Sequence, residues 1–93
     1  MRLLKQNVAI KSKVTDRVLD VCQDKDAYGT LIIYNDYKQL NQRFDILKAG
    51  ENVYYIVNKK SEKYLTIASN SEKNCAPIYE EPISGVRGQK FRI

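Results

Sequence analysis

The chain contains no histidine and no tryptophan, and these absences reduce the range of functions that it can have. Its 93 residues include seven tyrosines, two phenylalanines and two cysteines. Without histidine there is no imidazole for acid–base catalysis near neutral pH, no serine–histidine or cysteine–histidine pair, and no histidine-ligated metal. Carboxylates, lysines, tyrosines and two thiols are a poor set for catalysis. The composition therefore argues against an enzyme, and it indicates neither a metal site nor a cofactor.

Long apolar runs are also missing. No stretch of about 18 apolar residues occurs, so we predict no transmembrane helix. Residues 1–6 turn polar too early for the apolar segment of a signal peptide, so the chain is either cytosolic or has its signal outside this sequence. Cys22 and Cys75 lack Cys-x-x-Cys spacing, which leaves no zinc or redox motif. A disulfide between them and two free thiols are both open.

Basic residues outnumber acidic ones but are not gathered in one place. The formal net charge is +5, from 16 lysines and arginines against 11 acidic residues. Divided at Ile46, the two halves carry +2 and +3, and the longest basic runs are Lys11-Ser12-Lys13 and Lys59-Lys60. Nucleic-acid-binding proteins usually present a clustered basic face. A solvated polar surface is the better interpretation, and nucleic acid is not the expected partner.

Two segments of the chain, about residues 7–46 and 53–93, resemble each other along their length. Ile10-Lys11-Ser12-Lys13 precedes Ile56-Val57-Asn58-Lys59 by 46 positions. The closing segments, 42–46 and 89–93, are 47 positions apart. Similarity that keeps register over a whole unit indicates an internal duplication, and one inserted residue explains the shift. We therefore treat residues 1–93 as a single domain made of two repeats.

Each repeat has the pattern of four short strands separated by polar turns. The segment 53–57 is β-branched and aromatic, and Tyr64-Leu65-Thr66-Ile67 alternates with a period of two. No window predicts a helix of three turns. The sequence predicts an all-β fold with strands at 7–11, 18–21, 30–34 and 43–47 in the first repeat, and at 53–57, 64–67, 76–80 and 91–93 in the second.

These residues carry a resemblance to the repeat of the ricin-type β-trefoil lectin family. That repeat opens with a strand, a turn and a Tyr-Leu strand, has an Ala-Pro middle strand, and closes with Gln-x-Trp or Gln-x-Phe. Here the matching segments are 56–65 for the opening, Ala76-Pro77-Ile78 for the middle, and Asn41-Gln42-Arg43-Phe44 and Gln89-Lys90-Phe91 for the closes. The resemblance implies a β-trefoil-like fold and a non-catalytic carbohydrate-binding function, with a glycan such as a galactose-like sugar as partner. It also suggests a secreted or cell-surface protein.

The family fold closes three units around a pseudo-threefold axis, whereas this chain has two. Two units leave strand edges unpaired. We therefore expect a homo-oligomer, completion by a partner chain, or a longer lectin domain of which this sequence is a part. Association should bury the inward faces of Val53, Tyr55, Ile67 and Phe91, or their first-repeat counterparts. The alternative function is a protein-interaction module of a larger complex, such as a toxin or adhesin component, with a vestigial sugar site.

The resemblance places the sugar site in the first repeat. It assigns the acid to Asp20, the aromatic platform to Tyr34 and the amide to Asn41. Carboxylate and amide groups hydrogen-bond vicinal hydroxyls, and an aromatic face covers the apolar side of a pyranose. Ile32 stands where the family has a polar residue, which is a departure from the pattern.

The alignment of the two repeats with the family repeat has two further consequences. It predicts that the side chains of Leu31 and Ile33 face inward. In the second repeat it places Thr66, Glu81 and Gly88 at the acid, platform and amide positions, so that repeat has lost the set.

Other residues of these motifs are expected to be structural or solvated. Structural roles are expected for Gln42, Phe44, Gln89 and Phe91. The carboxylate pairs Asp24/Asp26 and Glu80/Glu81 are interpreted as solvated turn charges, because a glycosidase needs two carboxyls that face each other across a cleft.

Overall fold

Seven β-strands and three short 3₁₀ turns make up the computed structural model, which describes residues 2–92. The strands are β1 (Arg2–Val8), β2 (Val18–Val21), β3 (Leu31–Tyr34), β4 (Phe44–Gly50), β5 (Val53–Asn58), β6 (Tyr64–Ile67) and β7 (Ile78–Glu81). The turns are η1 (Leu40–Gln42), η2 (Ala68–Asn70) and η3 (Arg87–Gln89). No α-helix occurs within residues 2–92, which confirms the all-β prediction. In the same range, no helix has the length and apolarity needed to cross a membrane.

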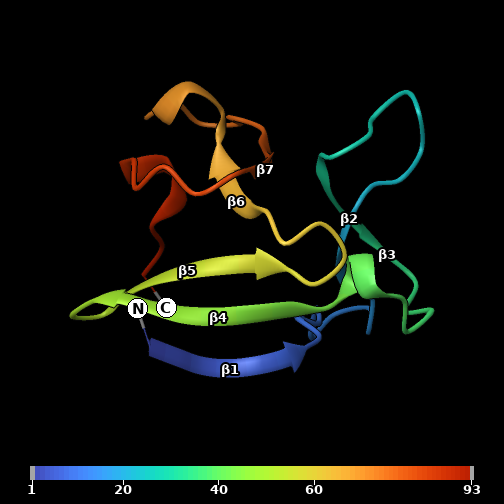
Figure 1. The fold of residues 1–93 in the computed structure, drawn as a ribbon. Coiled ribbons are helices and arrows are strands. Elements are labelled where there is room, and N and C mark those ends of the chain that lie inside the picture. Colours follow the sequence, from blue (N-terminus) through green and yellow to red (C-terminus); the bar gives the residue numbers. More distant parts are fainter. Residues whose placement is uncertain (1, 93) are drawn as a thin grey trace.

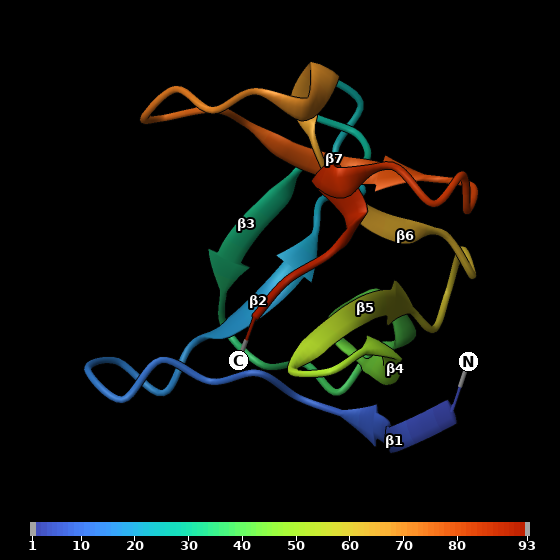
Figure 2. The ribbon, with the colours of Figure 1, turned by 90° about the vertical axis from the view of Figure 1, so that its left-hand side faces the viewer.

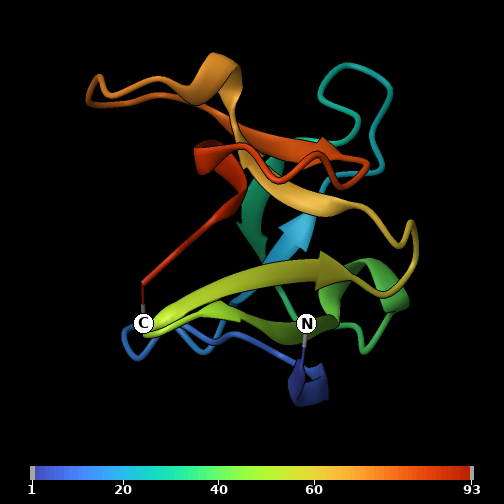
Figure 3. The same ribbon diagram turned by 60° about the vertical axis from the view of Figure 1, so that its left-hand side comes forward.

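The strands form one large sheet and one separate hairpin. Five strands are hydrogen-bonded in the order β1-β4-β5-β6-β7, and β2 pairs with β3. β1, β4 and β5 run side by side, and the β2–β3 and β6–β7 hairpins rise from the same side of this layer (Figures 1 and 2). Figure 3 shows both hairpins above β4 and β5. A single pairing, Val57 with Tyr64, joins β5 to β6, so the second hairpin can leave the plane of the layer.

The β4–β5 hairpin lies in the middle of the chain and links its two halves. Its register runs from Phe44 opposite Asn58 to Gly50 opposite Val53, with an irregularity near Gly50. The turn residue Asn52 has a φ of 58°, in the left-handed region that asparagine tolerates better than most residues. The β-branched and aromatic residues of β5 favour the extended backbone on the other side of this turn.

Equivalent strand contacts occur in both halves. Val8 pairs with Phe44 in the first half, and Tyr54 pairs with Phe91 in the second. The corresponding residues are 46 and 47 positions apart, the same offsets that relate the two sequence segments. The segments that resemble each other in sequence therefore also pair in the same way.

One hydrophobic core joins the hairpins to the layer. Its buried centre consists of Val21, Phe44 and Leu65, which come from both halves. Half-buried apolar side chains pack around it: Ile10, Leu19, Leu31, Ile56, Ile78 and Phe91. Full burial of side chains of this kind contributes about 1.5–3 kcal/mol each relative to exposure. The core therefore fixes the first hairpin, which carries the candidate site, against the rest of the molecule.

Four strands depart from the sequence-based prediction. The strand predicted at 43–47 is found at Phe44–Gly50, because its pairing with β5 continues as far as Val53. The strand predicted at 7–11 is found at Arg2–Val8, because this mostly exposed strand follows its partner β4 rather than an apolar alternation. The strand predicted at 76–80 begins only at Ile78, since Pro77 has no N–H for a ladder hydrogen bond. The strand predicted at 91–93 is a single bridge at Phe91, and residue 93 lies outside the described residues.

β1 leaves one side of the sheet open. Within residues 2–92 it pairs with β4 alone, so its other edge has no strand partner. Leu3 and Leu4 on this strand are each nearly half exposed. Unpaired edges with exposed apolar side chains are sites where further strands can add.

The structure decides one prediction about association and one question about the cysteines. The prediction that association buries Tyr55 is wrong, because Tyr55 is already buried, with its ring edge-on to Tyr64 at a centroid distance of 5.3 Å. The first-repeat counterparts Val21 and Phe44 are also buried within the chain. Both cysteines are free thiols, Cys22 buried and Cys75 exposed.

Candidate functional site

A cavity of about 350 Å³ lies beside the β2–β3 hairpin, in the first half of the chain. It brings Asp20, Tyr34 and Asn41 together, the three residues that the sequence assigned to a sugar site. The other lining residues are Cys22, Gln23, Asp24, Ile32, Tyr37, Gln39 and Gln42. We call this cavity the first pocket.

Asp20 supplies a fixed carboxylate at the base of the first pocket. It lies on β2 and is only 5% exposed. Asn41 Nδ2 donates to its Oδ1 at 3.0 Å, and Gln42 Nε2 donates to its Oδ2 at 2.8 Å. Each carboxylate oxygen can accept a further hydrogen bond. Asp20 is therefore held in one orientation and can still accept from a hydroxyl group.

Asn41 is held as firmly as the acid. Its Nδ2 also donates to Val21 O at 3.1 Å, so both amide protons have protein acceptors. Its backbone O accepts from Asn58 Nδ2 of the second half at 3.0 Å. The Asn41 side chain can then offer a ligand its Oδ1, an acceptor. Together with Asp20 it makes a site suited to a ligand that donates hydrogen bonds.

Gln42 is buried behind these two residues and connects them to the loop that follows β3. Its Nε2 donates to Asn35 O at 2.7 Å as well as to Asp20. Its Oε1 accepts from the Tyr37 N–H at 2.8 Å. One buried amide therefore fixes both the acid and the aromatic loop.

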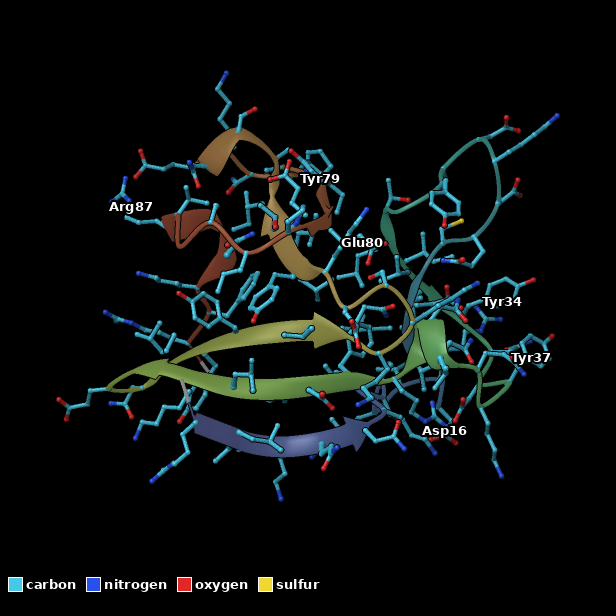
Figure 4. All side chains as sticks on the ribbon, viewed as in Figure 1. Asp16, Tyr34, Tyr37, Tyr79, Glu80 and Arg87 are labelled. Atoms are coloured by element: carbon cyan, nitrogen blue, oxygen red, sulfur yellow. The ribbon has the colours of Figure 1, made fainter. Side chains whose placement is uncertain are left out.

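Two tyrosines form the aromatic rim of the first pocket. Tyr34 is 51% exposed and Tyr37 58% exposed, and their ring centroids are 6.0 Å apart with a tilt of 52°. Figure 4 shows them side by side at one edge of the molecule. Arg43 holds the loop between them through two hydrogen bonds to Asp36, of 3.1 and 3.2 Å. This guanidinium contact lowers the pKa of the Asp36 carboxyl below its usual value.

The alternation along β3 is only partly as predicted. Ile32 and Tyr34 line the first pocket, and Leu31 packs against the core. The prediction that Ile33 faces inward is wrong, because its side chain is 47% exposed. Leu31 lies on the same face of β3, but only Leu31 is packed against the hydrophobic core.

Several residues of the first pocket were not predicted from the sequence. Tyr37 is the second aromatic ring, and the signal that could have found it is a tyrosine between the platform position and Asn41. Asp24 is exposed, as expected of a turn charge, yet it also lines the pocket. Gln23 lines it too, and its Oε1 accepts from Lys60 Nζ of the second half at 2.7 Å. Two groups from the second half, Lys60 and Asn58, thus support the site of the first.

The corresponding region of the second half has the same supporting contacts without the site. Gln89 is buried, and its Nε2 donates to Thr66 Oγ1 at 3.2 Å and to Pro82 O at 2.9 Å. Thr66 replaces the carboxylate with a hydroxyl. Glu81 takes the platform position, and its hydrogen bond with Tyr79 raises the pKa of that tyrosine.

Asn70 closes the space beside Gly88. Its Oδ1 accepts from the Gly88 N–H at 2.8 Å, and a Cβ placed on Gly88 would lie 2.6 Å from the same oxygen. An asparagine like Asn41 therefore cannot stand at this position without displacing Asn70. The remaining cavity is about 180 Å³, close to half the volume of the first pocket.

Comparison with known proteins identifies the family of the chain. The sequence matches the family described as "Ricin-type beta-trefoil lectin domain-like" over residues 40–93, more than half of the chain. The chain belongs to this ricin-type β-trefoil lectin-like family. Domains of the family are generally non-catalytic, and membership suggests a carbohydrate-binding module. A search of the curated proteins finds no match.

The fold has a solved relative. The chain is similar to a designed 3-fold symmetric protein, ThreeFoil, with a TM-score of 0.82 and 24% sequence identity. The similarity covers 90% of this chain and 61% of ThreeFoil, so the chain spans about three-fifths of that protein. The chain is therefore a partial β-trefoil.

Proposed function

We propose that the protein is a non-catalytic carbohydrate-binding module whose site is the first pocket, with Asp20, Tyr34 and Asn41 as sugar-binding residues. The observation that carries the proposal is the buried Asp20 carboxylate, fixed by two amides beneath a rim of two tyrosines. The acceptors Asp20 and Asn41 Oδ1 suit the hydroxyl protons of a sugar, and the tyrosine rings suit its apolar face. A galactose-like pyranoside has adjacent hydroxyls and one apolar face, so it matches a site with acceptors on one side and tyrosine rings on the other.

The proposal assigns only two acceptors to the sugar, Asp20 and Asn41 Oδ1, so the expected affinity for a single sugar is weak. A charge-assisted hydrogen bond contributes roughly 1.5–3 kcal/mol, so losing one should weaken binding by at least about tenfold. Binding without turnover is the activity that we propose, in line with the generally non-catalytic character of the family.

The test begins with a glycan array on the chain, followed by titration calorimetry with the best ligand. Asp20→Asn keeps the size of the side chain, removes its charge and turns one of its two acceptors into a donor. It should abolish measurable binding and lower stability, and circular dichroism checks that the variant is folded. Asp16→Asn is the matched control, because Asp16 is exposed and lies outside the first pocket. Binding by Asp20→Asn at wild-type affinity would refute the site, and a blank array would refute the function.

A second function is favoured by the open side of the sheet. The free edge of β1, with Leu3 and Leu4 nearly half exposed, and the coverage of 61% of a threefold protein support association with a further repeat. That repeat comes from another copy of the chain, from a partner chain, or from a further part of a longer protein. Light scattering over a concentration series separates these sources, because self-association raises the mass with concentration. A constant monomer mass would rule out the homo-oligomer.

A further inference from the structure

A second cavity lies at the seam between the two halves. Its volume is about 380 Å³, slightly larger than that of the first pocket, and the two share no lining residue. It is lined by Tyr28, Gly29, Thr30, Lys63, Pro77, Tyr79 and Glu80. One wall is the end of the loop between β2 and β3, and the other comes from β7 and the residues around it. Since each half supplies one wall, the cavity exists only where the halves meet. We call it the seam cavity.

Backbone contacts hold the two walls of the seam cavity in place. Thr30 and Tyr79 form an antiparallel bridge between the hairpins. Gly29 has a φ of +84°, a conformation that glycine adopts without strain, and a Cβ placed there would lie 4.0 Å from Glu80 Cγ. The Thr30 hydroxyl donates to Ala27 O at 2.6 Å, which closes the loop on itself. The cavity walls are thus ordered before any ligand arrives.

The seam cavity combines polar groups with the exposed ring of Tyr28. The Ser61 hydroxyl donates to Glu80 Oε2, which fixes the carboxylate and leaves Oε1 as an acceptor. Lys63 forms no ion pair with any described residue, so its ammonium group can donate. Tyr28 is 66% exposed at the loop end. Figure 4 shows Tyr79 and Glu80 on the part of the β6–β7 hairpin that faces the β2–β3 hairpin.

We propose that the seam cavity is a second carbohydrate subsite, which takes a neutral pyranoside unit. A pyranoside needs an acceptor and a donor for its hydroxyls and an aromatic surface for its apolar face. Glu80 Oε1, Lys63 and the ring of Tyr28 supply these in a space that holds one sugar ring. This site takes residues from both halves, so it does not follow the repeat and is independent of the first pocket.

The test is a ¹⁵N–¹H titration with methyl glycosides of galactose, glucose, mannose, N-acetylglucosamine and N-acetylgalactosamine. Each is added to about 20 mM, enough to detect a millimolar site. The amides of Gly29 and Glu80 report on the seam cavity, and those of Tyr34 and Asn41 report on the first pocket. We expect at least one glycoside to shift Gly29 and Glu80 with a binding curve of its own.

Two exposed tyrosines give matched variants, each expected to fold because its ring is largely in solvent. Tyr28→Ala should weaken the seam response by about tenfold or more and leave the first-pocket response intact. Tyr34→Ala should do the reverse. The proposal is overturned if no glycoside shifts Gly29 and Glu80, or if their shifts disappear in Tyr34→Ala, which would mean transmission from the first pocket. Shifts at Gly29 and Glu80 with none at Asn41 would instead refute the first pocket as the sugar site.

Discussion

In the first half of the molecule the buried Gln42 hydrogen-bonds a carboxylate, and in the second half the buried Gln89 hydrogen-bonds a hydroxyl. Each glutamine also holds the loop before it through a backbone carbonyl, and each precedes a phenylalanine of the core by two positions. Around this common arrangement, the first half has a pocket of about 350 Å³ and the second a cavity of about 180 Å³.

Comparing the two halves distinguishes residues that the fold requires from residues that a ligand requires. The glutamine and the phenylalanine occur in both halves because each closes the backbone of its own unit. The carboxylate, the tyrosine rim and the asparagine occur only in the first half, although the second half folds without them. Their presence is therefore not explained by folding, which supports a role in binding.

The largest expected effect comes from removing either glutamine. Gln42→Ala and Gln89→Ala each leave several buried hydrogen-bonding groups without a partner, so each should lower the free energy of unfolding by about 2–4 kcal/mol. Of these two variants, only Gln42→Ala should also abolish glycan binding, because Gln42 hydrogen-bonds Asp20 and Gln89 does not. Urea unfolding and titration calorimetry measure the two quantities. If folded Gln89→Ala protein also loses glycan binding, the claim that the site depends on the first half alone is contradicted.

Gly88→Ala tests how closely the second half is filled. The new Cβ would lie 2.6 Å from Asn70 Oδ1 and 3.0 Å from Ile67 O. Overpacking of this kind costs about 1–3 kcal/mol of stability, which thermal or urea unfolding would show. Adding Asn70→Gly removes the nearer of the two contacts and should recover part of the loss. A Gly88→Ala protein as stable as the wild type would mean that the space beside Gly88 is open.

Asn58→Ser tests the support that the second half gives to the first pocket. Asn58 Oδ1 accepts from the Lys60 N–H at 3.2 Å, as Ser12 Oγ accepts from the Val14 N–H at 3.1 Å at the equivalent turn. Serine therefore keeps the first turn bond. It deletes the bond to Asn41 O and the longer bond, of 3.3 Å, that Asn58 Oδ1 accepts from the Ser61 N–H. We expect a stability loss of about 1 kcal/mol and glycan binding weakened about threefold to tenfold.

Ser12→Ala is the matched control for that variant, because it deletes only the turn bond of the first half. Its affinity for the glycan should equal that of the wild type. If Asn58→Ser binds as tightly as Ser12→Ala, the second half does not position the site.

The smallest effect concerns Asp36 and pH. Its pKa is lowered in the folded protein, first through the hydrogen bond from Arg43, so the folded state takes up this proton less readily than the unfolded chain. The resulting stability is present above the usual value of 3.8 and is lost as the pH falls through the lowered pKa. Thermal midpoints of wild type and Asp36→Asn should therefore converge in acid and separate slightly above pH 4. Identical curves at all pH values would mean that the ion pair does not stabilise the loop.

Local patterns were enough to predict the strands that form hairpins, and the family resemblance named three of the residues that meet in the first pocket. β2, β3 and β6 were predicted within one residue, because each is short, apolar and bounded by turns. Asp20, Tyr34 and Asn41 could be named from a motif register, and the structure brings them to one cavity, while their role stays a prediction.

What could not be predicted depends on contacts between distant parts of the chain. Tyr37 reaches the pocket because Gln42 and the Asp36–Arg43 pair set the loop conformation, and no local pattern encodes that. Alternation gives the face on which Ile33 lies but not what covers it. The loss of an asparagine at Gly88 is visible in the sequence, whereas the side chain that fills the space, Asn70, lies 18 positions away.

Titration calorimetry of Tyr34→Ala beside Glu81→Ala, with the best ligand of the array, tests the central claim most directly. The two residues occupy equivalent platform positions, and Tyr34 is exposed enough to be truncated without loss of fold. We predict that Tyr34→Ala weakens binding by about tenfold or more and that Glu81→Ala leaves it unchanged. Equal affinities in both variants, or a loss confined to Glu81→Ala, would contradict a sugar site in the first half.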